Sequence, residues 1–172
     1  MLYVTHSAEE VTRLADHLVV LDQGQVKAQG PVGSVLTQVV NPVVVGEDAG
    51  ALIEGCVGAV DKQWHLSRVD FDGGCVWMRD AGLPVGKAVR IRILARDVSL
   101  ATSEPQNTSI QNQLLGTIQS ITPDAHPSQV MVVLKCGAEE VLARVTKRAV
   151  DELALQLGQP VWAQVKSVAL VA

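Results

Sequence analysis

The sequence predicts a mainly β protein in which two small β-barrels follow a short α/β unit. From about residue 50 onward, short apolar runs of strand type alternate with turns that contain glycine. This strand-rich pattern occurs twice, whereas strand-like and helix-like segments alternate in the part of the chain before it. A repeated set of short strands with frequent turns is typical of small barrels.

The first part of the chain has the pattern strand, helix, hairpin, helix. Residues 2–5 are rich in β-forming types. Ser7, followed three residues later by a glutamate, forms a capping box, and apolar residues at helical spacing come next. A turn at residues 23–24 joins two β-type runs, and Pro31 stands where the first turn of a helix tolerates proline. A unit this short cannot cover both faces of a sheet, so we expect it to be loosely packed or to lean on a partner.

The repeat is visible in glycines that stand at matching places. The segment around Gly55 matches the segment around Gly116, and the segment around Gly86 matches the segment around Gly158. Each copy spans about sixty residues with four or five strand-like runs, which indicates a barrel of the OB type. The expected fold is therefore a tandem of two OB-like small β-barrels, preceded by a short α/β remnant of a larger domain.

Three units are expected along the chain. Residues 1–42 form the α/β unit, 50–102 the first barrel and 107–172 the second, with a linker at 103–108. Inside the second barrel, a single helical insert starts after Thr146, which is a suitable N-cap residue.

The composition excludes several classes of function. The net charge of −4 and the aromatic content of 3% argue against a nucleic-acid binder, because phosphates need a concentrated basic field and single strands need stacking platforms. No run approaches the roughly 18 apolar residues of a spanning helix, so we expect no direct membrane insertion. Cys56, Cys75 and Cys136 are odd in number and widely spaced, which favours reduced thiols over a disulfide framework or a metal site.

An ordered set of short motifs lies near the N-terminus. Thr5-His6-Ser7 is followed by an acidic pair at 9–10, by Ala15-Asp16 and by the hydrophobic run VVLDQG. These motifs resemble the end of the ABC-transporter nucleotide-binding domain, so residues 1–42 are expected to be its C-terminal remnant. The resemblance implies that His6 is the switch histidine, which donates to the γ-phosphate of ATP in the parent protein.

The remnant does not include a phosphate-binding loop. Such a loop needs G-x-x-x-x-G-K-[ST], whose N–H groups and lysine hold the phosphates, and the 172 residues contain no such stretch. The ABC signature and Walker B segments are also absent from the sequence. We therefore expect Met1 to lie inside the ATPase domain, and we expect neither a catalytic residue nor ATP hydrolysis in this chain. The parent would be an ABC-type ATPase, which binds ATP only when intact.

Two further boxes stand in the last third of the chain. The opening box is SIQNQLLGT, at 109–117, and the closing box is VWAQVKS, at 161–167. Both resemble boxes of the molybdate-binding-protein (Mop) domain, a form of the transport-associated OB (TOBE) domain. Residues 92–100 also resemble the stretch that precedes this domain in molybdate ABC importers. The chain is thus similar to the C-terminal part of the ATP-binding subunit of such an importer.

The resemblance implies an oxyanion site made by the two boxes, at an interface between two copies of the domain. Molybdate offers only acceptors, so its site needs donors. The expected oxyanion-binding residues are Ser109, Gln111, Asn112, Lys166 and Ser167, with Arg96 and Lys147 as weaker candidates. Gln111 replaces an arginine of the family box, which removes a positive charge but keeps a donor amide. Lys166 could equally be a solvated strand lysine, and Ser109 a turn or cap residue.

The leading hypothesis is a regulatory domain: molybdate or tungstate binds the barrels and biases the importer toward a resting state. The alternative is a purely structural dimerisation module of an importer for another solute, and Gln111 keeps this alternative open. The expected partners are a second copy in a homodimer and, through the intact parent, the transmembrane permease. The expected location is cytoplasmic, at the inner face of the cell membrane.

Overall fold

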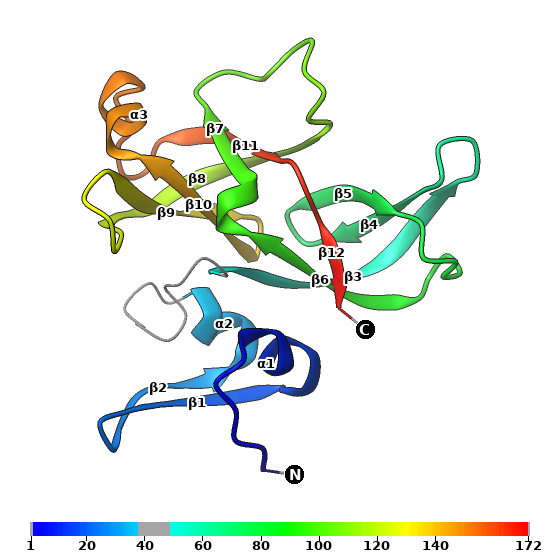
Figure 1. The fold of residues 1–172 in the computed structure, drawn as a ribbon. Helices are drawn as coiled ribbons and strands as arrows, with labels where there is room; N and C mark the ends of the chain where they lie inside the picture. The colour runs from blue at the N-terminus through cyan, green and yellow to red at the C-terminus, as the bar shows by residue number, and fades with distance from the viewer. Residues whose placement is uncertain (1, 38–48, 172) are drawn as a thin grey trace.

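The computed structural model describes residues 2–37 and 49–171. Its elements follow in chain order (Figure 1): α1 (Ala8–Leu14), β1 (His17–Asp22), β2 (Gln25–Pro31), α2 (Val32–Thr37), β3 (Gly50–Asp61), β4 (Leu66–Phe71), β5 (Gly74–Arg79), β6 (Ala88–Leu94), the 3-10 helix η1 (Ala95–Asp97), β7 (Val98–Ala101), β8 (Asn112–Pro123), β9 (Gln129–Cys136), β10 (Glu139–Thr146), α3 (Lys147–Glu152), β11 (Pro160–Val165) and β12 (Ala169–Val171). Two curled five-stranded sheets dominate and the helices are short, which confirms the mainly β class with two OB-like barrels.

The N-terminal unit follows its local signals, with one exception. Ser7 caps α1, because its Oγ accepts the backbone N–H of Glu10 at 3.3 Å. Strands β1 and β2 pair antiparallel around the expected turn, and α2 begins directly after Pro31. The exception is the expected strand at 2–5, which is wrong: among the described residues no strand pairs with this segment, and a strand needs a neighbour for its hydrogen bonds. Residues 38–42 of the expected unit lie outside the described part.

The N-terminal unit leans on the first barrel through a small apolar cluster. Val32 and Leu36 of α2 are buried there with Leu52 of β3. Val11 of α1 and Val171, at the end of β12, pack against them. Beyond this cluster the hairpin keeps apolar side chains in solvent; those of Val19, Leu21 and Val26 are more than half exposed.

The two sheets exchange their last strands. The first has the order β12-β6-β3-β4-β5 and the second β10-β9-β8-β11-β7. Strand β7 leaves the first half of the chain to pair with β11, and β12 leaves the second half to pair with β6 (Figure 1). The sheets therefore cross the expected boundaries of 50–102 and 107–172, since each sheet is completed by a strand from the other segment.

The barrels repeat the same backbone details. The long strands β3 and β8 each carry a bulge, directly after Val57 and directly after Ile118. Gly86, just before β6, donates its N–H to Val57 O at 2.7 Å. In the same way Gly158, just before β11, donates its N–H to Ile118 O at 2.8 Å. Both glycines adopt positive φ, +86° and +78°, which glycine reaches without a steric penalty. The matching glycines of the sequence thus mark a structural repeat.

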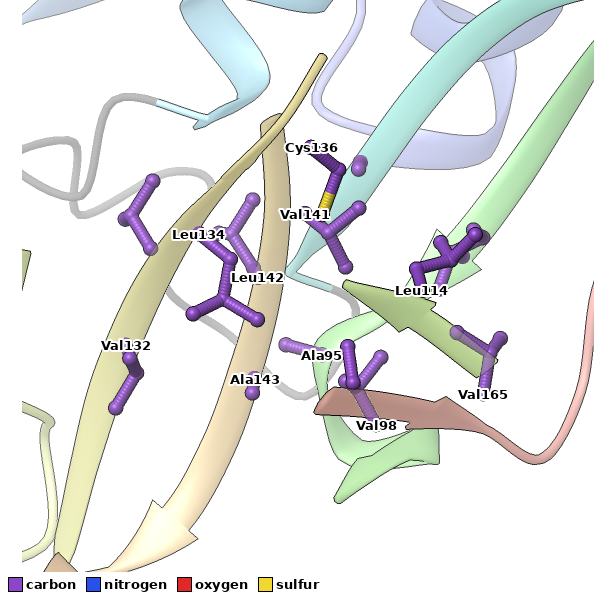
Figure 2. Packing of buried hydrophobic residues seen from close by; sticks show 14 of the residues in the cluster. Ala95, Val98, Leu114, Val132, Leu134, Cys136, Val141, Leu142, Ala143 and Val165 are labelled. Carbon is purple, nitrogen blue, oxygen red and sulfur yellow. The ribbon is translucent and has the colours of Figure 1, made fainter. Parts of the chain in front are cut away.

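One continuous apolar core joins the two barrels. Ile53 and Ile91 of the first sheet belong to the same buried cluster as Leu134 of the second. Figure 2 shows the part of this core where Val98 of β7 and Val165 of β11 lie on neighbouring strands. The shared core and the exchanged strands therefore join the two barrels into one structural unit.

Candidate functional site

The two chain crossings between the sheets lie side by side. Strand β6 passes to β7 through η1, and β11 passes to β12 through residues 166–168. The crossings are tied together because the backbone N–H of Lys166 donates to the carbonyl oxygen of Asp97 at 2.8 Å. Arg96 corresponds to Lys166 when the two repeats are aligned with a two-residue gap, and these residues therefore belong to adjoining crossings.

A pocket of about 380 Å³ opens beside these crossings. Three cations, Arg96, Arg144 and Lys166, line it together with one carboxylate, Asp97. The other lining residues are two hydroxyl-bearing and seven apolar ones: Ser99, Thr146, Val98, Leu100, Ile110, Val145, Ala149, Leu153 and Leu155. Among the described lining residues, cations therefore outnumber carboxylates although the chain carries a net charge of −4, and a concave site with such an excess favours small anions.

Arg144 differs from the other two cations because its side chain is buried. That side chain is 6% exposed, and its Nε donates to Oδ2 of Asp124 at 2.5 Å. The Asp124 side chain is 2% exposed, and it follows β8 in the turn toward β9. Arg96 and Lys166 are solvent-exposed. The pocket thus combines one fixed, desolvated cation with two exposed ones.

Helix α3 begins at the pocket wall. Thr146 caps it as the sequence predicted, since Thr146 Oγ1 accepts the backbone N–H of Ala149 at 3.1 Å. A threonine hydroxyl that accepts this bond still carries a proton that it can donate. Thr146 therefore adds a neutral donor type to the three cations.

The sequence candidates are distributed around the pocket rather than gathered in it. Lys166 and Arg96 line it. Ser167 and Lys147 are exposed and each directly follows a lining residue, but neither belongs to the lining.

The opening box contributes less than expected within one chain. Ser109 and Gln111 are exposed and lie outside the lining, although Ile110 between them is part of it. Ile110 N–H donates to Thr108 Oγ1 at 3.2 Å, and Gln164 Nε2 donates to the same oxygen at 3.4 Å. The loop is therefore attached to β11 with Ile110 toward the pocket.

Asn112 joins the two barrels. Its Oδ1 accepts the backbone N–H of Trp77 at 2.7 Å, and its Nδ2 donates to the carbonyl oxygen of Trp77 at 2.8 Å. The side-chain amide offers the same donor and acceptor as a peptide group, so it extends the ladder at the edge strand β5. The side-chain amide of Asn112 therefore forms a structural contact between the two barrels.

Sequence reasoning missed Arg144 and its partner Asp124. One signal was available: Arg144 interrupts the apolar run VLARV of a predicted strand, and a charge in such a run is buried with a partner or faces a cavity. Nothing in the sequence pointed to Asp124 as that partner. Thr146 was expected as a cap but not as a pocket residue.

A second hollow, of about 590 Å³, is lined by residues of the N-terminal unit and of both barrels. There Arg90 donates to Glu54 Oε1 at 3.0 Å, to Asp16 Oδ1 at 3.3 Å and to the carbonyl oxygen of Ala15 at 3.3 Å. The hydrogen bond that Arg90 donates to Glu54 is the main cause that raises the pKa of Arg90, and burial raises the pKa of Glu139. Four carboxylates and two cations line this hollow, so it lacks the positive excess of the first pocket.

Residues 2–37 and 49–171 also contain potential metal ligands, helices, thiols and His6. No group of three or more His, Cys, Asp or Glu side chains there can hold a metal ion. Within the same part of the chain, the helices are all too short or too polar to cross a bilayer. Cys56 and Cys75 are exposed free thiols, and Cys136 is buried, which raises its pKa to about 11. His6 is exposed just before α1.

Comparisons with known proteins identify relatives of the whole chain. The TOBE domain family matches residues 108–172. The molybdenum import ATP-binding protein ModC of Methylococcus capsulatus is 48% identical over 171 residues, which cover 99% of this chain and 48% of that protein. The ModC protein of Thiobacillus denitrificans is 46% identical over 171 residues, which cover 99% of this chain and 47% of that protein. The chain therefore spans about half the length of the curated relatives that it matches.

A solved structure supports the fold. The cytoplasmic molybdate-binding protein ModG, crystallised with molybdate bound, superposes with a TM-score of 0.59 and 29% identity, over 70% of this chain and 94% of that chain. The resemblance drawn from the sequence motifs is thereby confirmed. This chain carries a TOBE domain and corresponds, over about 99% of its length, to the C-terminal half of the ModC molybdenum import ATP-binding proteins.

Proposed function

We propose that the barrels of this chain bind a tetrahedral oxyanion, molybdate or tungstate, as the regulatory domain of an ABC importer ATPase. In the intact subunit this domain would act at the inner face of the cell membrane, with the transmembrane permease as a partner. The chain by itself has no G-x-x-x-x-G-K-[ST] loop in its 172 residues, so its proposed role is sensing and not ATP hydrolysis.

The convergence of Arg96, Arg144 and Lys166 on one pocket carries this proposal. A fully deprotonated oxyanion accepts hydrogen bonds and donates none, and the polar atoms of these three side chains only donate. Hydrogen bonds from a cation to an anionic oxygen are roughly twice as strong as neutral ones. Because these charges act at short range in a partly dry pocket, the acidity of the whole chain does not oppose them.

Regulation also needs a physical connection between the pocket and the ATPase part. Strand β12 begins three residues after Lys166 and pairs with β6, with Val171 opposite Arg90. Val171 packs in the cluster of α1 and α2, and Arg90 donates to the carbonyl oxygen of Ala15 at the end of α1. Helix α1 begins two residues after His6, with Ser7 between them as its N-cap. One short strand therefore links the proposed anion site to the switch-histidine segment, and an anion shifts the importer only if it binds the resting state more tightly.

Calorimetric titration with molybdate, tungstate and sulfate tests the proposal. We expect molybdate and tungstate to bind, and Lys166→Ala to weaken that binding about tenfold or more, as expected for the loss of a charge-assisted hydrogen bond. Lys62→Ala is the matched control, because Lys62 is an exposed lysine on the β3–β4 turn, outside the pocket. Silence for all three anions in a folded wild-type protein would refute the proposal and favour the structural dimerisation module.

The variant Ser109→Ala tests where the opening box acts. Ser109 lies outside the pocket lining of its own chain. Unchanged affinity in Ser109→Ala would mean that one chain completes the site. Lost affinity would mean that a second copy brings its Ser109 to the pocket, and sedimentation of the protein with and without molybdate would then reveal the homodimer.

A further inference from the structure

We propose that Arg90 couples the anion pocket to the N-terminal unit: when the pocket is occupied, Arg90 holds the end of α1 more firmly on the first barrel. The inference rests on the proposed function and deepens it, because it names the residue through which the anion would act. Its basis is the position of Arg90, which donates hydrogen bonds both within its own sheet and to the end of α1.

One face of the first sheet carries the N-terminal unit. Arg90 of β6 pairs with Glu54 on one side and with Val171 on the other, and residues paired in this way direct their side chains to the same face. Val171 packs on that face against the small apolar cluster that includes α2. Ile91, the next residue of β6, is buried in the barrel core, as the alternation along a strand requires. Arg90 therefore lies at the contact between the barrel and the N-terminal unit.

The guanidinium of Arg90 divides its hydrogen bonds between the two units. It donates to Glu54 Oε1 at 3.0 Å within the sheet, and to Asp16 Oδ1 and the carbonyl oxygen of Ala15, both at 3.3 Å, in the N-terminal unit. Ala15 is the C-cap of α1, and a cation is favoured beside the last carbonyl groups of a helix. The carbonyl oxygen of Asp16 accepts the backbone N–H of Val32, the first residue of α2, at 3.0 Å. One side chain therefore holds the segment that connects the end of α1 with the start of α2.

The contact between the N-terminal unit and the barrels is small and partly open. Among the described residues its apolar cluster has three buried members, and the hollow of about 590 Å³ adjoins it at Val32. Asp16 lines this hollow from the N-terminal unit, and three glutamates line it from the barrels: Glu54, Glu139 and Glu140. Like charges across a gap repel, and Arg90 donates to a carboxylate on each side. Loss of Arg90 would remove this attraction and leave the repulsion, so it favours undocking.

Both strands at Arg90 lead to the anion pocket. Strand β6 continues from Arg90 into η1, where Arg96 and Asp97 line the pocket. Strand β12, which lies along β6 (Figure 1), leads from Val171 back to the crossing at Lys166. An anion in the pocket lies next to both crossings, so it restrains the two strands whose pairing places Arg90.

Hydrogen exchange of the full chain, with and without molybdate, tests the inference. Undocking exposes the segment 8–22 to exchange, so we expect molybdate to slow its exchange about threefold or more in wild type. Arg90→Gln should speed this exchange about threefold or more without ligand, and it should remove most of the molybdate effect. The molybdate affinity of Arg90→Gln should fall by no more than the factor by which molybdate slows exchange in wild type, because coupling between two sites is reciprocal.

Two further variants complete the experiment. Arg68→Gln is the matched control, because Arg68 is an arginine of the same sheet that pairs with Asp70 and lies outside the lining of the hollow. Glu54→Gln removes the carboxylate that competes with the N-terminal unit for Arg90 and that repels Asp16, so it should slow exchange of the segment 8–22. A merely structural ion pair would give faster exchange instead.

The outcomes separate this inference from the proposed function. If wild-type protein binds molybdate but exchange of the segment 8–22 does not change, or if Arg90→Gln responds to molybdate as wild type does, then the inference is overturned and oxyanion binding stands. If wild-type protein binds no oxyanion, the proposed function fails and the inference fails with it. Circular dichroism precedes each measurement; should Arg90→Gln not fold, Glu54→Gln decides, since its side chain is 77% exposed and faster exchange there would overturn the inference.

Discussion

The two barrels share the same backbone features but differ in how deeply their ion pairs are buried. Each has a bulged long strand and a glycine turn bonded to it in the same way. One ion pair of the first barrel, Arg68 with Asp70, has side chains that are 37% and 38% exposed, whereas Arg144 and Asp124 of the second are 6% and 2% exposed. The repeat thus keeps the backbone features that shape each sheet, while the buried ion pair belongs to the barrel that borders the candidate pocket.

The largest expected difference in stability is between variants of these two ion pairs. Asp124→Ala leaves Arg144 buried without its carboxylate, so we expect it to lower the free energy of unfolding by about 3–5 kcal/mol. Asp70→Ala removes the half-exposed partner of Arg68, where water replaces the lost contact, so we expect a much smaller change. Urea unfolding of both variants beside wild type makes the comparison. Equal losses would show that burial does not distinguish the pairs.

A second effect tests the contact between the barrels. Gly73, in the β4–β5 turn, has φ +132°, and a Cβ there would collide with the carbonyl oxygen of Cys136 in the second barrel. Gly73→Ala should therefore cost roughly 2–4 kcal/mol through backbone strain and overpacking. Gly158→Ala is the matched control: Gly158 has φ +78° with nothing within 4 Å of the added Cβ, so only the backbone penalty of about 1 kcal/mol applies.

Thermal unfolding measures this pair of glycine variants. The expected order is wild type, then Gly158→Ala, then Gly73→Ala. If Gly73→Ala were no less stable than Gly158→Ala, the close approach of the barrels at Cys136 would not be a tight contact in solution.

The elements of the fold were readable from the sequence, but their partners were not. Thr146 capped its helix as expected, and the pairing of Gly86 with Gly158 identified the repeat, because caps and turns depend on neighbours a few residues away. The exchange of β7 and β12 was not foreseen. Both strands are short and apolar enough to fit either sheet, and only the shared core and the crossing at Lys166 determine which one they join.

The residues of the candidate site show the same difference between local signals and tertiary contacts. Lys166 and Arg96 were found because one stands in a recognisable box and the other matches it through the repeat. Arg144 and Asp124 were missed because they are 20 residues apart in the chain, and the pair forms only when the turn after β8 meets β10. Residues that come together only through a tertiary contact leave little trace in one sequence.

Substitution of Asn112 should lower stability less than Asp124→Ala or Gly73→Ala. It also tests most directly whether a residue of the opening box serves binding or structure. Asn112 stands in the opening box, yet its amide bonds the backbone of Trp77 on both sides. Asn112→Ala should therefore lower the free energy of unfolding by about 1–3 kcal/mol, through one donor and one acceptor of Trp77 left unpaired. Gln119→Ala, at an exposed position of the same strand β8, is the control, and we expect it to be close to neutral.

Molybdate titration of the folded Asn112→Ala protein then decides its role. A stability loss with unchanged affinity would mean that this box residue serves the junction between the barrels. Lost affinity without a loss of stability would mean instead that Asn112 gives up Trp77 to reach the anion. In that case β5 would release its tie to β8 when the anion binds, and the junction of the barrels would itself respond to the ligand.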